Sequence, residues 1–401
     1  MSAACLATHR QKYSIELFEG SAQSGGRCRS YYDKNLDMEI DNGNHLILSA
    51  NTNFLKFCKL IDSEKTLKCL DSSFNFFNLK NKSKWSLKIE GNLFPFWVFN
   101  KKQRIPNTRI LDYLSILKII FCSDSEVVSK YTKFNNLYTY FWEPLTLGIL
   151  NTHCKDASAL LLKNVLKETF LKGKKSSMIY QPRVSWNRTI IEPATTFLLK
   201  RKVKLNYNSL LKKIIFKSDG MSKLIFQNKE IDINSSDKVV LAMPPHNVQK
   251  ILPEIKLPTE FNTILNVHFK YDIKKLDHLS TPILGLLNSI THWIFIKNNY
   301  ISVTVSAAND FNDEKQESLV KKIWHEVKTA LGIKSKMMPI YRLLREKKAT
   351  YNQSPHNLNL IRNISNLPKN LSIIGDWTET NFPCTIESSI LSGKKYVNSL
   401  D

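Results

Sequence analysis

The sequence predicts an α/β fold with two domains, and three observations support this prediction. The chain has 401 residues, which is enough to bury the cores of two domains. Alternating apolar and polar residues predict a strand over Ser14–Phe18, which ends at the acidic residue Glu19. A second, apolar strand is predicted over Leu371–Ile374, directly before Gly375 and Asp376. Strands that end at glycine and acidic residues are typical of nucleotide-binding α/β domains.

The composition is that of a folded protein with an unusual charge. Hydrophobic residues make up 42% of the chain and charged residues 23%, while the net charge is +23. Such a charge would attract nucleic acid or phospholipid. However, the lysines are spread along the chain, and lysine, asparagine and isoleucine are abundant throughout, as in proteins of A/T-rich genomes. We favour compositional drift as the main cause. Because no nucleic-acid-binding motif stands out, we expect no nucleic-acid partner.

The cysteines and the apolar runs indicate a cellular compartment. The seven cysteines are scattered and form no C-x-x-C motif, which fits a reducing cytoplasm better than a disulfide framework. No apolar run reaches the length of a transmembrane helix, and the first residues do not resemble a secretory signal. We therefore expect a cytoplasmic protein. No histidine spacing supports a metal site, so none is expected.

The first part of the chain has several features that suit a dinucleotide. A helix rich in small residues is predicted over Met1–Arg10, before the strand that ends at Glu19. At this place in a Rossmann fold, the Glu19 carboxylate would accept hydrogen bonds from a ribose. Gly25 and Gly26 would let backbone N–H groups approach a pyrophosphate, and Arg27 would offer it a matching charge. A surface turn with a solvated arginine is the alternative.

The rest of the chain shows helical and strand periodicity in turn. One helix, over residues 109–121, has apolar residues on more than one of its faces. The other expected elements are helices over residues 53–61 and 310–331, a strand–turn–strand unit over 204–216, and strands over 238–243, 264–269, 292–295 and 301–307.

Two further segments give the chain a resemblance to a known family. Asp41-Asn42-Gly43-Asn44-His45 follows the Gly-Gly-Arg turn, and Gly375-Asp376 lies near the far end. With Glu19 and Gly25-Gly26-Arg27, they resemble the FAD-binding amine oxidase and phytoene desaturase superfamily, in which such motifs fold around one flavin. Within it, the chain most resembles the hydroxysqualene dehydroxylases, because it also contains the segments Trp142-Glu143-Pro144-Leu145, Arg345-Glu346-Lys347-Lys348-Ala349-Thr350 and Thr385-Ile386-Glu387. The resemblance implies a helix over residues 138–145. The likeness runs from residue 1 to the end.

The resemblance implies a discontinuous domain organisation. We expect a Rossmann-like FAD-binding domain from residues 1–72, 181–250 and 341–401, and an inserted α+β substrate domain from residues 73–180 and 251–340. The chain departs from the family at its start, where the first strand and the G-x-G-x-x-G loop are missing. Either Met1 is an internal methionine or the first strand has been lost. In the second case, the pyrophosphate lacks its best N–H cradle.

The resemblance also assigns site residues. Gly43 would let the backbone approach the flavin ring, Asp376 would bond ribityl or pyrophosphate-side groups, and a helix starting near Thr385 would direct its N–H groups at the cofactor. Asp41 and His45 are the candidate catalytic acids, since histidine titrates near working pH. A turn in which His45 satisfies a backbone group is the alternative. The full cofactor set is Glu19, Gly25, Gly26, Arg27, Asn42, Gly43, Gly375, Asp376, Thr385 and Ile386.

The activity that the resemblance implies is reductive removal of the hydroxyl group of hydroxysqualene, which gives squalene, an apolar isoprenoid. An apolar, water-poor pocket would protect the allylic cation from water. Other interpretations remain open: a carotenoid-type desaturase or amine-oxidase-like flavoenzyme, a flavin-free isoprenoid-binding protein, or a basic protein that coats membranes or nucleic acid. Binding by the last would fall steeply with salt. The motifs do not identify the electron donor for FAD.

An aromatic stretch suggests contact with lipid. Residues 93–99, Leu-Phe-Pro-Phe-Trp-Val-Phe, are followed by Lys101, Lys102 and Arg104. Aromatic residues beside lysines are typical of membrane interfaces. This pattern predicts either peripheral contact with the inner face of the cell membrane or a buried strand of the substrate domain.

Overall fold

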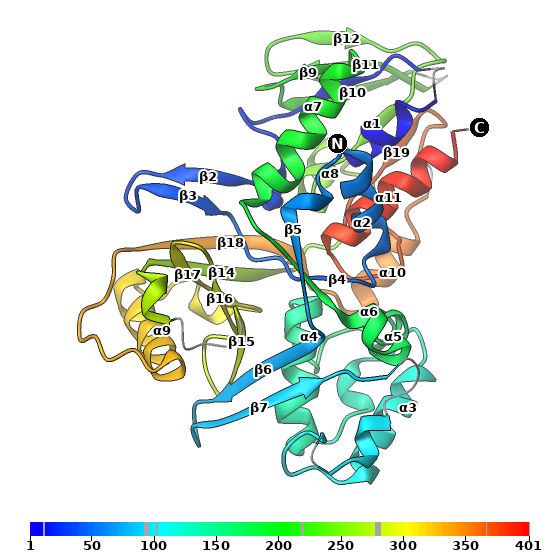
Figure 1. Ribbon diagram of the computed structural model, residues 1–401. Coiled ribbons are helices and arrows are strands. Elements are labelled where there is room, and N and C mark those ends of the chain that lie inside the picture. Colours follow the sequence, from blue (N-terminus) through cyan, green and yellow to red (C-terminus); the bar gives the residue numbers. More distant parts are fainter. Residues whose placement is uncertain are drawn as a thin grey trace.

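The computed structural model describes residues 1–10, 13–91, 96–101, 103–217, 220–276, 282–365 and 367–400. Figure 1 shows three regions along the long axis of the molecule. Short parallel strands and the N- and C-terminal helices lie at one end, a large sheet crosses the middle, and a group of helices forms the other end. The two termini are close together, as the nucleotide-binding prediction requires.

Two short parallel strand pairs lie near the termini. β1 (Glu16–Phe18) pairs with β9 (Lys204–Asn206), and β13 (Val239–Leu241) pairs with β19 (Leu371–Ile373). Within the described ranges, no strand is hydrogen-bonded between the two pairs. Helix α1 (Ser2–Ala7) packs against residues from beside both pairs, in a small cluster that contains Ala3, Ala7, Ile15, Val240 and Ile374. Parallel pairs with helices packed on them agree with the predicted α/β class.

Smaller antiparallel units surround these pairs. β2 (Ser30–Asp33) and β3 (Met38–Asp41) form a hairpin that ends at the predicted Asp41–His45 segment. The other two units are three-stranded: β10 (Leu211–Lys217), β11 (Gly220–Phe226) and β12 (Glu230–Asp232) form one, and β4 (Ile47–Leu48), β8 (Ile179–Pro182) and β5 (Leu67–Leu70) form the other. The strand–turn–strand predicted over residues 204–216 is found as β9 and β10, which pair with different partners and so do not form a hairpin.

Within the described residues, the large sheet has seven strands. Their order is β18 (Tyr341–Tyr351), β14 (Phe261–Lys270), β17 (Tyr300–Val305), β16 (Trp293–Ile296), β15 (Ile283–Leu287), β6 (Ser73–Asn78) and β7 (Ser83–Lys88). Only the β15–β6 pair among them is parallel. β18 lies in the range expected for the FAD domain, yet it pairs with β14 from the range expected for the substrate domain. The domain boundaries stay a prediction.

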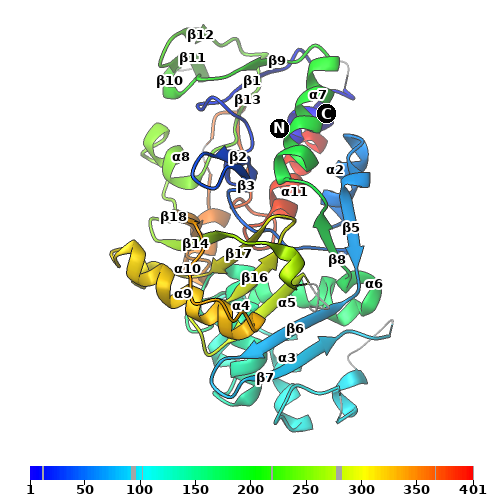
Figure 2. The ribbon, with the colours of Figure 1, turned by 60° about the vertical axis from the view of Figure 1, so that its left-hand side comes forward.

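Helix α9 (Gln316–Leu331) covers one face of this sheet, as Figure 2 shows. Its apolar residues recur every three to four positions, so they form one buried stripe. The helix ends at Gly332, whose φ of 68° is left-handed and favours glycine. The stripe packs against sheet residues such as Phe269, Ile294 and Val303.

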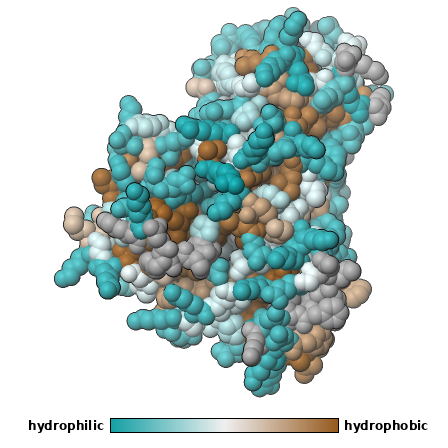
Figure 3. Space-filling view, viewed as in Figure 1, coloured by the Kyte–Doolittle hydropathy of each residue, from teal (hydrophilic) through white to brown (hydrophobic). Residues whose placement is uncertain are grey.

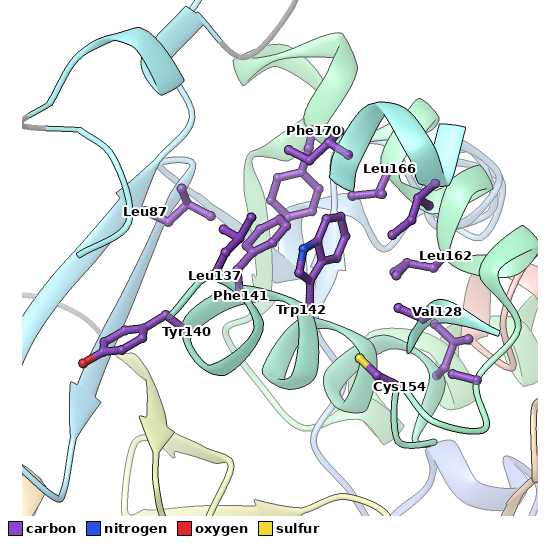
Figure 4. Packing of buried hydrophobic residues seen from close by; sticks show 14 of the residues in the cluster. Leu87, Val128, Leu137, Tyr140, Phe141, Trp142, Cys154, Leu162, Leu166 and Phe170 are labelled. Atoms are coloured by element: carbon purple, nitrogen blue, oxygen red, sulfur yellow. The ribbon is translucent and has the colours of Figure 1, made fainter. Parts of the chain in front are cut away.

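The helical end of the molecule is built around buried aromatic residues. It contains η4 (Ile110–Tyr113), α3 (Leu114–Ile120), η6 (Tyr138–Trp142), α4 (Glu143–Leu150) and α5 (Ala159–Glu168). In Figure 4 the rings of Phe141, Trp142 and Phe170 pack together. The Trp142 indole N–H donates to the Ser115 hydroxyl at 3.1 Å, so its polar atom is satisfied. The helix predicted over residues 138–145 is confirmed.

Four of the remaining helices lie at the terminal end: α2 (Thr52–Leu60), α7 (Glu192–Lys200), α8 (Pro245–Ile251) and α11 (Ile386–Asn398). The other two, α6 (Lys174–Ser177) and α10 (Pro355–Arg362), lie between this end and the helical end. Of the predicted aromatic stretch, residues 92–95 lie outside the described residues. Residues 96–99 form the 3-10 helix η3 (Phe96–Phe99), so the expected buried strand is not found there. In the part of the chain that the structure describes, no helix has the length and apolar character needed to cross a bilayer.

Candidate functional site

The structure brings the predicted motifs of the two chain ends into contact. Arg27 lies in η1 (Gly26–Cys28), and its Nη2 atom is 2.6 Å from Oδ2 of Asp376. Its Nη1 atom donates to the backbone carbonyl of Ala349 in β18. The pKa of Arg27 is raised, mainly by the negative charge of the Asp376 carboxylate. This ion pair joins the N-terminal Gly-Gly-Arg turn, the C-terminal Gly-Asp segment and the large sheet.

The two glycines before Arg27 have left-handed backbones. Gly25 has φ of 113° and Gly26 has φ of 53°, a region that other residues enter only at a cost. A Cβ atom at Gly25 would lie 2.9 Å from Cδ1 of Ile191, whereas one at Gly26 would meet nothing within 4 Å. Gly25 is therefore required by both conformation and space, and Gly26 only by conformation. The space over Gly26 suits the approach of a ligand.

Glu19 follows the last residue of β1, as predicted. Its Oε1 atom accepts hydrogen bonds from the backbone N–H and the hydroxyl of Ser21, at 2.9 and 3.0 Å. Its backbone N–H continues the parallel ladder by donating to Asn206 at 2.8 Å. This places a carboxylate at the C-terminal end of a parallel strand, where α/β folds bind ligands. Among the described hydrogen bonds, none links it directly to Arg27 or Asp376.

The predicted Asn42-Gly43 segment lies beside the arginine turn. The Asn42 backbone N–H donates to the carbonyl of Arg29 at 2.9 Å, and its side chain donates to the carbonyl of Arg27 at 3.4 Å. On its other side, the Asn42 carbonyl accepts from the Asn266 side chain of β14 at 3.4 Å. The segment is therefore held between the arginine turn and the large sheet.

Asp41 is buried, and both of its carboxylate oxygens are engaged. Oδ1 accepts from the Ser30 hydroxyl at 2.6 Å and from the Trp186 backbone N–H at 3.0 Å. Oδ2 lies 3.4 Å from Nζ of Lys297, whose side chain is only 11% exposed. The Asp41 backbone N–H faces the Tyr300 hydroxyl at 3.4 Å. Asp41 thus connects the β2–β3 hairpin, the start of η8 (Asn187–Ile191) and the turn between β16 and β17.

His45 lies close to Asp41 and is partly buried. Its ring packs edge-on against Trp186, with ring centroids 5.5 Å apart. Burial lowers the pKa of His45 to about 4, and the nearby Asp41 charge offsets only part of that effect. The ring is therefore neutral at neutral pH. Its Nε2 atom is buried and has no hydrogen-bond partner within the described structure, and so is free to bond a ligand.

A polar network behind this segment was not predicted from the sequence. The Asn44 side chain donates to the hydroxyls of Ser302 and Thr304 at 2.7 and 3.0 Å, while its Oδ1 atom is buried without a partner in the described residues. The Ser302 hydroxyl also lies 2.8 Å from Nδ1 of His268. Alternation along β14 and β17 could have placed these side chains on one face, but not opposite Asn44.

Thr385 and Ile386 stand at the start of α11, as predicted. Thr385 is its N-cap, and its hydroxyl accepts from the Ser388 backbone N–H at 3.2 Å. Glu387 has a role that the sequence did not reveal. Its carboxylate accepts from the backbone N–H groups of Asn53 and Phe54, at 3.0 and 2.8 Å, and so caps helix α2 from a distant part of the chain.

Arg27 and Asp376 line a narrow crevice, and Gly375 lies next to Asp376 in the chain. The Gly375 backbone N–H donates to the Ser392 hydroxyl of α11 at 3.1 Å, which fixes the Gly-Asp segment to the helix. The other walls of the crevice include residues that were not singled out from the sequence as site residues, namely Phe261, Lys348, Tyr351, Trp377 and Cys384. Lys348 adds a cation to the two charges of the Arg27–Asp376 pair.

Relatives and solved structures resemble this chain over nearly its whole length. Residues 1–399 match the model of the family described as flavin containing amine oxidoreductase. Two curated relatives named hydroxysqualene dehydroxylase are 33% and 32% identical to the chain, one from Zymomonas mobilis subsp. mobilis and one from Rhodopseudomonas palustris. Each alignment covers 98% of this chain and 94% of the relative.

The solved structures show likeness in fold alone. Cyclohexylamine oxidase from Brevibacterium oxydans IH-35A superposes with a TM-score of 0.71 at 12% identity, covering 99% of this chain and 95% of the other. An oxidoreductase from Methanosarcina mazei gives a TM-score of 0.71 at 11% identity, with coverage of 99% and 97%. Both agree with the α/β fold described above.

Proposed function

The chain belongs to the family of flavin-containing amine oxidoreductases, and we propose that it removes the hydroxyl group of hydroxysqualene to give squalene, with FAD as its cofactor. The relatives named for this activity are similar to the chain from end to end. The observation in the geometry that supports the proposal most directly is the contact of Arg27 with Asp376, which joins the two motifs expected to surround one flavin.

The residues at the site fit a flavin nucleotide. Two polar atoms just after Gly43 in the chain, Oδ1 of Asn44 and Nε2 of His45, are buried without partners in the described structure, and such atoms need a ligand or water. Arg27 and the first N–H groups of α11, after Thr385 and Ile386, would hold phosphate groups. Carboxylates would accept from ribose and ribityl hydroxyls. The residues assigned to FAD are Glu19, Gly25, Gly26, Arg27, Asn42, Gly43, Gly375, Asp376, Thr385 and Ile386.

The reaction needs a hydride, an apolar pocket and a proton. Reduced FAD, when bound, supplies the hydride. The C–O bond of the substrate breaks with its electron pair on oxygen, a C–H bond forms at the allylic carbon, and the departing hydroxide takes a proton to become water. The protein must keep other water molecules away from the developing allylic cation. The buried cluster that contains Phe141, Trp142 and Phe170 is apolar, and we propose that it helps to shield the substrate's hydrocarbon from water.

We propose that His45 is the residue that faces the departing hydroxyl group. A neutral imidazole carries one N–H, so the tautomer with its proton on Nε2 would donate a hydrogen bond to the substrate although burial lowers the pKa of His45 to about 4. We assign Asp41 the role of a positioning residue, because Ser30, Trp186 and Lys297 already engage its carboxylate oxygens. Asp41 would fix the loop that carries His45, and its charge would stabilise positive charge nearby.

We also propose that the protein works in the cytoplasm in peripheral contact with the inner face of the cell membrane. An apolar isoprenoid substrate dissolves in the bilayer rather than in water. A net charge of +23 would attract the anionic lipids of the cytoplasmic leaflet. Salt-dependent binding to such lipids is expected.

A product assay tests the proposed activity. The purified chain, supplied with FAD and reduced with dithionite, is mixed with hydroxysqualene dispersed in detergent, and the lipids are analysed by gas chromatography and mass spectrometry. Squalene should appear only when protein, FAD and reductant are all present. Recovery of unchanged hydroxysqualene would overturn the proposal. Products with additional double bonds, formed with oxidised FAD instead, would support a desaturase.

A further inference from the structure

A short helical segment at the end of the molecule exposes apolar side chains to solvent. η4 and α3 run together from Ile110 to Ile120. One side of this segment, with Tyr113, Ile116 and Ile119, is buried in the aromatic core. The other side is also apolar but exposed, and Leu111 and Phe121 are 73% and 83% accessible. A segment that is apolar on both sides has a second surface to cover.

The exposed side chains form one surface. Positions 110, 111, 114, 117 and 121 recur at helical spacing and so share a side of the segment. Phe134, which is 89% exposed, joins them because its neighbour Asn135 donates to the Asp112 carboxylate of η4 at 3.1 Å. We call this surface the α3 face; its residues are Ile110, Leu111, Leu114, Leu117, Phe121 and Phe134. Figure 3 shows hydrophobic residues among hydrophilic ones at this lower end of the molecule.

Positive charges surround the α3 face. Arg109, Lys118 and Lys133 are exposed, and none has an acidic partner within the described residues. The acids nearby are already engaged, because Asp112 accepts from the Arg109 backbone N–H at 2.8 Å and Asp124 pairs with Arg362 at 3.0 Å. Aromatic and aliphatic side chains surrounded by cations suit the boundary between anionic headgroups and acyl chains.

We propose that the α3 face is the surface with which the protein docks on an anionic lipid bilayer, an inference that rests on the proposed function. The net charge favours lipid over a second copy of the chain as the partner of the α3 face. Two copies with +23 charges would repel each other, and a symmetric contact would place the same cations face to face. An anionic bilayer instead attracts these cations while it buries the apolar side chains.

The position of the α3 face also suits delivery of a hydrocarbon. The side chains behind it belong to one continuous apolar cluster, which runs from Ile116 and Ile119 through Trp142 to Phe76 and Phe295 of the large sheet. A protein that rests on the bilayer with this face would therefore place its apolar interior next to the acyl chains. The substrate would not have to cross water.

Vesicle binding of the full chain tests the docking surface. The probes are phosphatidylcholine vesicles with and without phosphatidylglycerol, and binding is measured by co-sedimentation. The double variant Leu111→Ser/Phe121→Ser should weaken binding by about tenfold or more, since two large apolar side chains no longer enter the acyl region. The matched control is Met337→Ser/Ile340→Ser, which removes two side chains that are 80% and 60% exposed elsewhere. It should bind as the wild type does.

A charge variant provides a second measurement. Lys118→Gln/Lys133→Gln should weaken binding to vesicles that contain phosphatidylglycerol, and added salt should abolish the difference from wild type. The proposal is overturned if the wild type does not bind these vesicles, or if the control variant loses as much binding as Leu111→Ser/Phe121→Ser. It is also overturned if the wild type is a dimer in solution that the double variant dissociates.

Activity measurements distinguish a failure of the docking surface from a failure of the proposed function. Leu111→Ser/Phe121→Ser should convert detergent-dispersed hydroxysqualene at the wild-type rate but lose about tenfold with substrate embedded in vesicles. If the wild type binds vesicles through this face yet produces no squalene in either assay, the docking surface stands and the proposed function fails. If the variant loses both activities equally, the docking surface is overturned.

Discussion

The guanidinium of Arg27 lies 2.6 Å from the carboxylate of Asp376, although 349 positions separate the two residues in the chain. The contact joins two segments at the terminal end of the molecule. Arg27 follows β1 and its turn, and Asp376 follows β19. The contact also sets the spacing between two groups that a dinucleotide would need. Several consequences for cofactor binding and stability can be measured.

Replacing Arg27 tests whether this contact supports flavin binding. Arg27→Lys keeps the charge but loses the forked donor geometry that reaches Asp376 and Ala349 together. We expect about tenfold weaker retention of FAD, measured as the flavin-to-protein absorbance ratio after gel filtration. Arg183→Lys, at an exposed arginine, is the control. Equal flavin content in all three proteins would remove Arg27 from the site.

The glycine pair gives a test in which one neighbour controls for the other. Both Gly25→Ala and Gly26→Ala force alanine into a left-handed backbone, at about 1 kcal/mol each. Only Gly25→Ala also brings Cβ within 2.9 Å of Ile191, so it should cost roughly 1–3 kcal/mol more. Chemical unfolding of the two variants measures the difference. Equal destabilisation would show that Ile191 moves aside freely.

Asp41 should behave as a structural anchor as well as a site residue. Asp41→Asn leaves Lys297, which is 11% exposed, without its partner, and should lower the free energy of unfolding by about 3 kcal/mol. Asp37→Asn, at an exposed acid of the same hairpin, should change it by less than about 0.5 kcal/mol. In a double-mutant cycle, Lys297→Met should recover part of the loss. Additive effects would mean that the two side chains do not interact.

His45 should affect the rate more than the binding of flavin. His45→Gln keeps a hydrogen-bond donor, but an amide cannot accept and release a proton as an imidazole does. We expect squalene formation to fall by about a hundredfold. FAD content should stay at the wild-type level. His325→Gln, at an exposed histidine of α9, serves as the control. A His45→Gln protein with full activity would exclude His45 from the chemistry.

Three histidines with lowered pKa values should make the fold sensitive to acid. Burial lowers the pKa of His45, His268 and His292 to about 4, whereas an exposed ring in the unfolded chain titrates near 6.5. Between these two values the unfolded chain binds protons that the folded chain does not bind. Stability is therefore unaffected above about pH 6.5 and is lost as the pH falls toward about 4.

One of these rings can be tested separately. Between about pH 7 and pH 5, each should remove about 2 kcal/mol from the free energy of unfolding. His268→Gln should therefore lose about 2 kcal/mol less than the wild type over this interval, measured by urea unfolding. His268 is fully buried, which makes it the clearest choice. An identical fall in both proteins would show that another group causes the acid sensitivity.

The parts of the site that could be predicted from the sequence are those with a local signature. Glu19 ends an alternating strand, the glycines before Arg27 mark a left-handed turn, and Gly375-Asp376 follows an apolar strand. Each signature lies within about ten neighbouring residues, where backbone rules apply directly. The proximity of Arg27 and Asp376 was predictable only through the resemblance to a family.

The rest depends on contacts between distant residues. Asn44 meets Ser302 and Thr304 across more than 250 positions, and no local pattern specifies such partners. Glu387 likewise caps a helix that begins 335 positions earlier, at Thr52. Over η4 and α3 the periodicity showed two apolar sides, but only packing decides that Ile116 is buried and Leu111 is exposed. These partners and burial differences depend on the tertiary structure, which local sequence patterns do not specify.

The most direct test of the central claim is an anaerobic single turnover. The chain carrying FAD is reduced with one equivalent of dithionite, so that its visible absorbance is bleached, and is then mixed with hydroxysqualene without oxygen. We predict that the absorbance near 450 nm, where oxidised flavins absorb, returns as about one squalene forms per flavin. Bleached flavin that persists in the presence of substrate, or absorbance that returns without squalene, would contradict FAD-dependent dehydroxylation by this chain.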